Sequence, residues 1–278
     1  MNIKTNWIKH LHNIRRAETN KIFHNCPANM FNNGLELGAG DGFQSKLILK
    51  YIRKLISTDY NLPRLQKQPT STIEYLKCDA EEIDRYFSSE KFDIIFSSNM
   101  LEHLPNPEKA LRSMHRILKN DGIMIHLIPN PLWKFSHIAM FYPNLFIRII
   151  EKISTPNRLI TDIRKKITKK SDILKTKTEF DDNPKSASHN HTWIWPSTHG
   201  AYKNHWKEFL GFRKKRWLKL FKSEGFKIIK IINGPVCSGY GFGLNNIRKQ
   251  LEKIGLSSSY AYITIKKNYS SPHIKFFQ

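Results

Sequence analysis

The chain contains 278 residues, 40% of them hydrophobic and 12% aromatic, which is enough core for one large domain or for one domain with a sizeable insertion. Its three cysteines (Cys26, Cys78 and Cys237) are scattered, which argues against a disulfide framework and a cysteine-based zinc site and favours a reducing, cytosolic setting. The net charge of +23 favours anionic partners such as nucleic acid, anionic lipid or acidic glycan.

The charge is unevenly distributed along the chain. Lys and Arg outnumber Asp and Glu by 18 to 14 in residues 1–131 and by 28 to 9 in residues 132–278. The N-terminal sequence has no apolar run long enough for a secretory signal, and the most apolar late stretch, residues 137–150, is interrupted by Pro143 and too short to span a bilayer. We therefore expect a cytoplasmic protein, or one bound peripherally at the inner face of a membrane.

The first half of the sequence alternates between helical and extended patterns. A first helix is predicted over residues 7–23, and another begins with Asn106 as its cap and Pro107 at its first position. Short apolar runs with few charges have the pattern of buried parallel strands. These runs cover residues 34–37, 55–58, 73–76, 93–97 and 122–128. Repeated units of this kind predict a doubly wound α/β sheet.

The alternation stops after residue 130 and returns near residue 196. We therefore divide the chain into a core over residues 1–131, a basic and aromatic insertion over 132–195, and the rest of the core over 196–278. The last part is expected to hold one helix over residues 205–223, ended by Gly225, and two strands over 226–232 and 260–266.

The strongest functional signal is a glycine-rich turn between a strand and a helix. Residues 35–42 read LELGAGDG, and such a turn lets a ligand approach the backbone and the N–H groups of the following helix. A dinucleotide fingerprint would need glycine where Phe43 stands, so that fingerprint is not matched.

Two acidic residues follow the next two predicted strands. Asp59 is placed to accept hydrogen bonds from both hydroxyls of a ribose. Asp79 is placed to meet an adenine amino group, although Asp79 with Glu82 also has the spacing of a helix capping box. Both uses of Asp79 are compatible with one another.

Four motifs in order resemble those of class I methyltransferases of the type 11 kind. Residues 35–42 resemble the first motif of that family and residues 57–59 (STD) the second. Residues 92–104 (FDIIFSSNMLEHL) resemble its fourth strand and following loop, and residues 117–122 (ILKNDG) resemble the turn before its fifth strand. The resemblance covers about residues 34–130.

The resemblance implies a Rossmann-like sheet of seven strands in the order 3-2-1-4-5-7-6, with the last strand antiparallel and a helical insertion after the fifth. It implies S-adenosyl-L-methionine as cofactor, with the acid and glycines of the first motif holding its methionyl end and Ser97 to Asn99 lining the opposite side. The residues expected to bind the cofactor are Glu36, Gly38, Ala39, Gly40, Asp59, Asp79, Ala80, Ser97 and Asn99.

Transfer to a hydroxyl would require a base, for which His103 and His199 are the candidates. The alternative for each is a structural role, in which the histidine only packs within its loop. For His103 that loop lies beside the cap predicted at Asn106. We expect no metal site, because methyl transfer from a sulfonium needs none and His189 with His191 lacks a second ligand pair.

Looser patterns resemble methyltransferases of surface-polysaccharide and lipopolysaccharide assembly, among them residues 43–45, 58–61 and the His199-Gly200 pair before a basic helix. They imply O-methylation of a sugar on a lipid-linked or nucleotide-linked glycan. The aromatic residues and the Lys/Arg cluster of the insertion also suit contact with an anionic membrane, or a lid.

Two alternatives stay open. RNA methylation is the rival activity, although the chain has no recognisable RNA-binding module, so nucleic acid is the weaker partner. An inactive cofactor-binding subunit is the other. The sequence does not indicate an oligomeric state.

Overall fold

The computed structural model describes residues 6–61, 72–154, 195–196, 198–200, 202–237, 240–242 and 244–278, with the side chains of 151–154 left out. The chain divides into two compact units, one formed by Met1–Ser136 with Thr198–Gln278 and the other by His137–Ser197. The first unit contains the whole sheet and all the site residues discussed below.

The sheet has seven strands in the order β3-β2-β1-β4-β5-β7-β6. Neighbouring strands from β3 to β5 are parallel, whereas β7 runs antiparallel to both β5 and β6. The strands are β1 (Phe31–Leu37), β2 (Ile52–Asp59), β3 (Ile73–Lys77), β4 (Phe92–Ser98), β5 (Leu118–Pro129), β6 (Phe226–Asn233) and β7 (Ser259–Lys266). The predicted strand order and the antiparallel last strand are confirmed.

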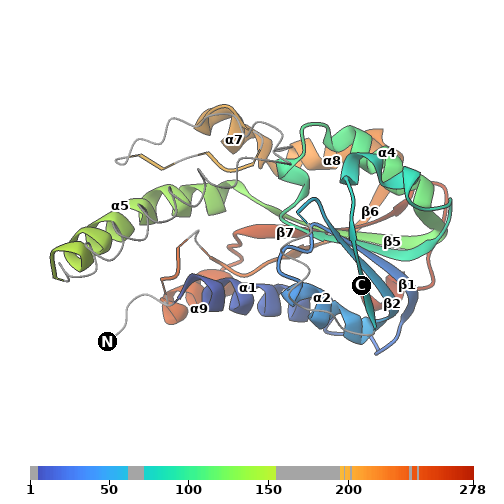
Figure 1. Cartoon of the computed structure of the whole chain (residues 1–278), viewed down its shortest axis with the longest axis horizontal. Coiled ribbons are helices and arrows are strands. Elements are labelled where there is room, and N and C mark those ends of the chain that lie inside the picture. The colour runs from blue at the N-terminus through green and yellow to red at the C-terminus, as the bar shows by residue number, and fades with distance from the viewer. Residues whose placement is uncertain are drawn as a thin grey trace, which may run out of the picture. The chain divides into compact units, whose positions relative to one another are not determined.

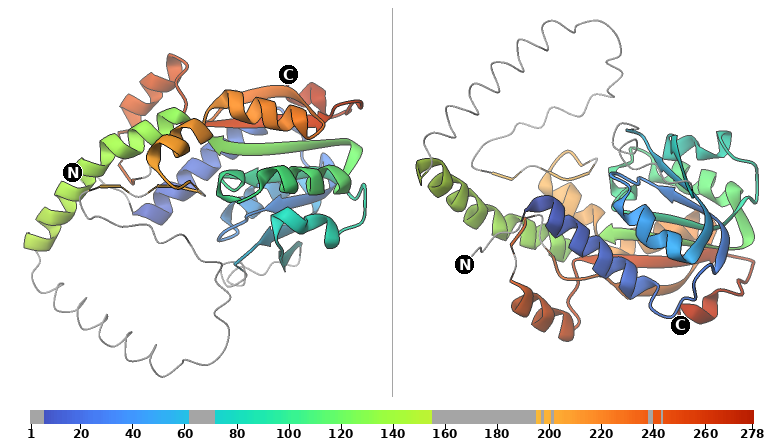
Figure 2. Two further views of the ribbon diagram at one scale, coloured as in Figure 1. Left: turned by 90° about the horizontal axis from the view of Figure 1, so that it is seen from above. Right: turned by 60° about the horizontal axis from the view of Figure 1, so that its bottom comes forward.

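Helices cover both faces of the sheet, as Figures 1 and 2 show. Helices α4 (Pro107–Ile117) and α8 (Lys214–Ser223) lie over one face, and α1 (Trp7–Ile22) and α2 (Phe43–Ile48) over the other. Each face has its own apolar core, with Met114, Trp217 and Phe221 in one and Phe23, Phe31 and Ile48 in the other. The Ile- and Leu-rich strands are buried between these two layers, which explains their continuous apolar runs.

Two details of the C-terminal part differ from the sequence prediction. The single helix predicted over residues 205–223 is wrong, because the chain forms α7 (His205–Gly211) and then α8. Arg213 between them is extended, with φ −63° and ψ 132°. The ring of Tyr202 packs so closely on Gly211 that a Cβ there would lie 2.3 Å from it. The predicted ending at Gly225 is confirmed, with φ +83°.

The cap predicted at Asn106 is also wrong in its chemistry. Pro107 does begin α4, but Asn106 makes no side-chain capping bond. Its backbone N–H and side-chain amide instead donate to the carboxylate of Glu81, at 2.8 and 3.3 Å. Glu81 lies in the short helix η2 (Ala80–Arg85), so Asn106 joins η2 to the start of α4.

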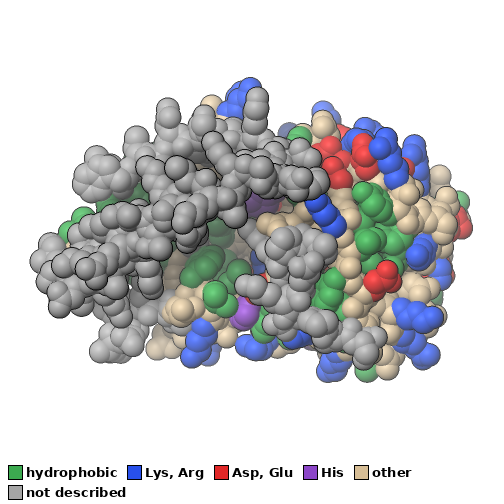
Figure 3. All heavy atoms as spheres, in the orientation of Figure 1, with side chains coloured by type: hydrophobic (Ala, Val, Ile, Leu, Met, Phe, Trp, Pro, Cys, Tyr) green, Lys and Arg blue, Asp and Glu red, His purple; other side chains and the backbone are tan. Residues whose placement is uncertain are grey.

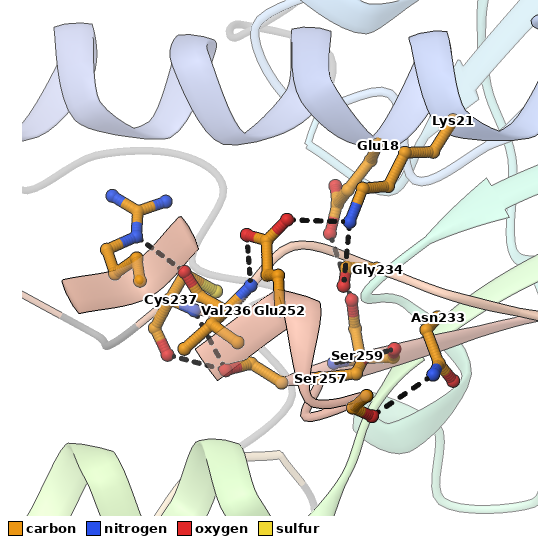
Figure 4. Close-up of polar contacts among 12 residues, drawn as sticks. Glu18, Lys21, Asn233, Gly234, Val236, Cys237, Glu252, Ser257 and Ser259 are labelled. Carbon is orange, nitrogen blue, oxygen red and sulfur yellow. Dashed lines mark hydrogen bonds and ion pairs between the residues drawn. The ribbon is translucent and has the colours of Figure 1, made fainter. Parts of the chain in front are cut away.

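The long connection between β6 and β7 contains a helix that was not predicted, α9 (Asn245–Lys253). Figure 4 shows how it is anchored to α1. Glu252 accepts a hydrogen bond from Lys21 of α1 at 2.8 Å and one from the backbone N–H of Val236 at 3.0 Å. Helix α9 has no buried residue, so the usual apolar signal for a core-facing helix is missing from its sequence.

The insertion begins with one long helix, α5 (Pro131–Ser154), which contains Pro143. The helix carries exposed apolar side chains at helical spacing, and they fall on one side of it. They are Phe135, Tyr142, Phe146, Ile149 and Ile150. None of the helices in the described part of the chain is both long and apolar enough to cross a membrane. The basic run at 164–166 and the pair His189 and His191 lie outside the described residues.

Candidate active site

Strands β1 and β4 are neighbours at the centre of the sheet, and the strand order reverses direction between them. In open α/β sheets, ligands bind outside the carboxyl ends of the strands at such a switch point. The glycine turn follows β1, and the loop that contains His103 follows β4. The fold therefore brings both predicted halves of the site to the same edge of the sheet.

The turn after β1 has the backbone shape that its glycines predict. Gly38, Gly40 and Gly42 all have positive φ, at +74°, +61° and +73°. A Cβ at Gly38 would lie 2.7 Å from the side chain of Met100, whereas a Cβ at Gly40 would meet nothing within 4 Å. Gly38 is thus required by packing, and the space beside Gly40 lets a ligand approach the backbone closely.

Asp59 holds the turn against the end of β2. One carboxylate oxygen accepts the N–H of Gly40 at 2.8 Å, and the other accepts the N–H of Asn61 at 2.8 Å. The N–H groups of Gly38 and Ala39 donate to the carbonyl of Thr58 at 2.8 and 3.0 Å. Each oxygen of Asp59 retains further acceptor capacity, so this geometry fits a carboxylate that also receives ribose hydroxyls.

Glu36 connects the turn to the neighbouring elements. Its side chain is buried, and Oε2 accepts hydrogen bonds from the hydroxyls of Ser45 and, at 2.9 Å, Ser57. Burial raises the pKa of Glu36 to about 7, against the opposing effect of these two bonds. Glu36 thus joins β1 to α2 and β2, and its expected contact with the methionyl end stays a prediction.

The side chain of Ser97 is bonded within the sheet. Its hydroxyl is completely buried and lies 2.7 Å from Nδ1 of His126, a fully buried histidine of β5. Burial lowers the pKa of His126 to about 3, so this ring is neutral. The Ser97 side chain therefore joins two central strands, and the expected place of Ser97 opposite the cofactor stays a prediction.

Asn99 is held by the first helix, through a residue that sequence reasoning missed. It has φ +50°, and with its side-chain oxygen turned toward α1 it accepts from Nη2 of Arg15 at 3.0 Å. Arg15 also donates to Ser98 Oγ at 2.6 Å and to Glu18 at 2.9 Å. Arg15 thus connects α1 to the end of β4. In the sequence, only the helical spacing of the polar residues of α1 could have indicated this contact.

The same helix also contacts the glycine turn. Nε2 of His12 lies 2.7 Å from the carboxylate of Asp41, and its ring stacks on Phe43 at a centroid distance of 3.8 Å. Burial tends to raise the pKa of Asp41, but hydrogen bonds, that from His12 first among them, outweigh this effect and hold the pKa below its ordinary value. Helix α1 is therefore connected to both halves of the candidate site.

Asp79 acts as a helix cap in the structure. Its carboxylate accepts the N–H of Glu81 at 2.9 Å at the start of η2. Glu82, the expected partner in a capping box, bonds instead to Arg85 and Lys109. Asp79 and the next residue, Ala80, are both half-buried, so the second expected use of Asp79, toward an adenine, stays a prediction.

The two histidines chosen from sequence lie side by side, although most of the insertion separates them along the chain. The rings of His103 and His199 are 4.4 Å apart between centroids. Nε2 of each faces Oε1 of Glu102, at 3.9 and 4.0 Å respectively. Glu102 and His103 lie in η3 (Leu101–His103), directly after β4. Sequence reasoning missed Glu102, even though it precedes His103.

Glu102 is the unusual member of this group. Its side chain is 0% exposed, and neither carboxylate oxygen has a hydrogen-bond partner among the described residues. Burial raises the pKa of Glu102 to about 8, opposed in part by the nearby charge of Arg15. Burial also lowers the pKa of His103, so its imidazole is neutral near pH 7. The two imidazoles and the carboxylate could accept a proton or hold a metal ion.

Aromatic rings surround His199 on the other side. Trp133, at the start of α5, lies 4.8 Å from the His199 ring between centroids, and Phe212 lies 6.5 Å from it. Gly200, with φ +74°, brings the loop against Glu102, because a Cβ there would lie 2.5 Å from the Glu102 carbonyl oxygen. The position of His199 is thus fixed by packing on both sides.

Residues 35–126 match a protein family described as methyltransferase domain. The ubiquinone biosynthesis O-methyltransferase of Histophilus somni is 24% identical over 127 residues, which are 42% of this chain and 53% of that protein. The 2-methyl-6-phytyl-1,4-hydroquinone methyltransferase 1 of rice is 26% identical over 131 residues, 42% of this chain and 39% of that protein. The chain thus spans about half the length of the first of these relatives.

Two solved structures share the fold over most of the chain. A SAM-dependent methyltransferase from Archaeoglobus fulgidus matches with a TM-score of 0.51 and 16% identity, covering 92% of this chain and 94% of that one. A chain of the complex that contains the Trm112 methyltransferase activator of Haloferax volcanii matches with a TM-score of 0.55 and 12% identity, covering 93% and 92%. The likeness extends beyond residues 35–126 to the antiparallel end of the sheet, and it concerns the fold.

Proposed function

We propose that this protein is an S-adenosylmethionine-dependent methyltransferase that transfers a methyl group to a hydroxyl. The observation that carries the proposal is the pairing, at one switch point, of an open glycine turn with Asp59 and a histidine pair beside a buried carboxylate. The match of residues 35–126 to the methyltransferase domain supports it. The turn, Asp59 and Asp79 fit a ligand with a ribose, an adenine and a charged amino-acid end.

When bound, S-adenosylmethionine supplies a methyl group on a positively charged sulfur, which becomes a neutral thioether as the acceptor oxygen takes the methyl group. The chain's own residues position the two partners. The open space beside Gly40 lets the cofactor approach the backbone, and Asp59 orients its ribose. Arg15 holds Asn99 at the end of β4. His103 and His199 are the groups at which the acceptor hydroxyl loses its proton, with Nε2 as the accepting atom.

For the acceptor, we propose a sugar hydroxyl on a surface glycan or on its lipid-linked or nucleotide-linked precursor. The strongly basic second half of the chain supports an anionic acceptor of this kind. Trp133 beside His199 offers an aromatic face for a sugar ring. A ring hydroxyl of a quinol is the second candidate, favoured by the names of the relatives from Histophilus somni and rice.

RNA methylation is less well supported. On the face in Figure 3, the described Lys and Arg side chains are scattered among Asp and Glu and form no continuous stripe. A protein that follows a nucleic-acid backbone needs a basic track along its surface. The described part of that face therefore offers no such track.

The proposal also includes peripheral contact with an anionic membrane through α5. Phe135 and Phe146 are 67% and 64% exposed on the apolar side of this helix. Phe146→Glu should lower co-sedimentation with phosphatidylglycerol vesicles several-fold, and binding should weaken at high salt. Ile254→Glu, which changes a 74% exposed residue at the C-terminal cap of α9, is the matched control. Equal binding by both variants and the parent would reject the role of α5.

Transfer of tritiated methyl from S-adenosylmethionine into fractionated cell extract tests the activity and the acceptor together. We expect label in a glycan or glycolipid fraction that resists ribonuclease. Label in a quinol fraction would select the second candidate, and label lost on ribonuclease treatment would favour RNA. Absence of label with intact cofactor binding would contradict the activity and leave an inactive cofactor-binding subunit.

A further inference from the structure

The cluster formed by Glu102, His103 and His199 has a spacing that hydrogen bonding does not explain. Nε2 of each histidine is 3.9 or 4.0 Å from Oε1 of Glu102, beyond the range of a hydrogen bond. One ligand atom from each of the three residues lies within 4.8 Å of the others. The three groups therefore surround a common point without bonding to one another.

The carboxyl group at this point has no hydrogen-bond partner in the described part of the chain that would stabilise its charged form. Glu102 is fully buried, and both its oxygens lack hydrogen bonds among the described residues. Burial without a partner favours the neutral acid, whereas a bound cation would favour the ionised carboxylate. The charge of Arg15 acts on Glu102, but that guanidinium donates its hydrogen bonds to Glu18 and Ser98.

The cluster is also built by the surrounding fold. Gly200 allows the second loop to lie directly on the backbone of Glu102, and Trp133 packs against the ring of His199. The side chains of His103 and His199 are 42% and 35% exposed, whereas Glu102 is fully enclosed. The site thus has a buried carboxylate at its base and two imidazoles at an accessible mouth, which is how an ion would enter.

We propose that Glu102, His103 and His199 bind one divalent transition-metal ion through the carboxylate and the two Nε2 atoms. Two imidazoles and one carboxylate are a set that suits Zn²⁺, Co²⁺, Mn²⁺ or Fe²⁺ and leaves coordination positions open. Metal–ligand bonds of about 2.0–2.2 Å place neighbouring ligand atoms roughly 3–4 Å apart, so the present spacing needs only small side-chain movements.

This inference rests on the proposed function and refines its acceptor half. A cation here would lie beside the acceptor and bind its hydroxyl oxygen directly. The ion would then lower the pKa of that hydroxyl, which would release its proton to solvent water at the accessible mouth, and the histidines would hold the ion in place of the proton-accepting role proposed above. From the sequence alone we expected no metal site, and the proposed ion differs from that expectation.

The test is titration of Co²⁺ into the intact, chelator-treated and dialysed protein, followed by visible absorption and by metal analysis. We expect one Co²⁺ per chain with the absorption of a site containing nitrogen ligands. His103→Ala and His199→Ala should each weaken Co²⁺ binding by at least about tenfold. His24→Ala, at an exposed histidine after α1, should leave it unchanged.

The double variant His189→Ala/His191→Ala separates this site from the other histidine pair in the sequence. Retained binding in that variant is expected. Absence of stoichiometric Co²⁺ binding in the parent, or loss of binding in the double variant while His199→Ala binds normally, would overturn the proposal. Calorimetric binding of S-adenosylmethionine without added metal tests the proposed function separately, so either idea can fail alone.

Discussion

The two halves of the candidate site are assembled in different ways. The donor half, which we define as the glycine turn with Asp59, comes from consecutive β-α units. This turn follows β1 and is bonded to the end of β2 and to His12 of α1. The acceptor half, which we define as Glu102, His103 and His199, joins η3 to a loop that returns to the core after the insertion. Buried carboxylates show the contrast, because Glu36 is bonded to two serines, whereas Glu102 has no bond among the described residues. The buried carboxylate of the donor half is thus tied into the fold, whereas that of the acceptor half has no bond of its own among the described residues.

The largest expected effect is that of His199→Ala, which should impair the acceptor half without changing the binding of the donor. His199→Ala should lower kcat for methyl transfer by about 10²- to 10⁴-fold, because the acceptor hydroxyl loses either its proton acceptor or a ligand of the ion that activates it. The dissociation constant for S-adenosylmethionine should stay within about twofold of the parent's. His24→Ala provides the control, and a parallel loss of donor affinity in His199→Ala would show that the two halves are not separate.

The buried carboxylate of the donor half should give a pH-dependent stability. The pKa of Glu36 is raised from 4.5 to about 7 in the folded state, so the folded protein binds the extra proton between these values. The free energy of unfolding therefore falls as pH rises through this window, by up to about 3 kcal/mol from this group. Glu36→Gln cannot titrate and should remove that part of the fall in urea denaturation at pH 4.5 and 8. Identical pH slopes in parent and variant would refute the assignment.

Asp59→Ala addresses the donor half directly. Losing hydrogen bonds between a carboxylate and the ribose should weaken S-adenosylmethionine binding by about 10- to 100-fold. The backbone N–H groups of Gly40 and Asn61 also lose their acceptor, so circular dichroism should first confirm the fold. Co²⁺ binding should be unchanged, and unaltered donor affinity by calorimetry would eliminate the ribose role.

The smallest expected effect concerns the backbone that positions His199. Gly200→Ala would place a Cβ 2.5 Å from the carbonyl of Glu102 and move the loop, lowering kcat by about tenfold or less without changing donor affinity. Gly255→Ala is a matched control, because Gly255 has φ +84° but open space around it. Both should lose some stability from the positive φ. Equal kcat in the two variants would argue against positioning by Gly200.

Sequence patterns could locate the donor half from local features but could not show that the acceptor residues meet, for a physical reason. The glycine turn and Asp59 are local features, since each motif directly follows its own strand. His103 and His199 were both chosen, but their meeting depends on how the insertion returns, which no local pattern encodes. Arg15 and Glu102 were missed because their roles arise from tertiary contacts of α1 and from burial.

Contacts with neighbouring elements also went unpredicted. Glu36 and Ser97 stand in motif positions, and their side chains bond to neighbouring strands inside the core. Asn106 has the residue type of a cap, but its side-chain amide donates to Glu81 of another element. The break between α7 and α8 lies beside Gly211, on which Tyr202 packs, a contact between residues that sequence periodicity does not compare.

Isothermal titration of S-adenosylmethionine into the intact, metal-free chain tests the central claim most directly. We predict one donor site per chain, weakened in Asp59→Ala and retained in His199→Ala. Absence of donor binding to the folded parent, or loss of binding in His199→Ala with Asp59→Ala unaffected, would contradict the claim.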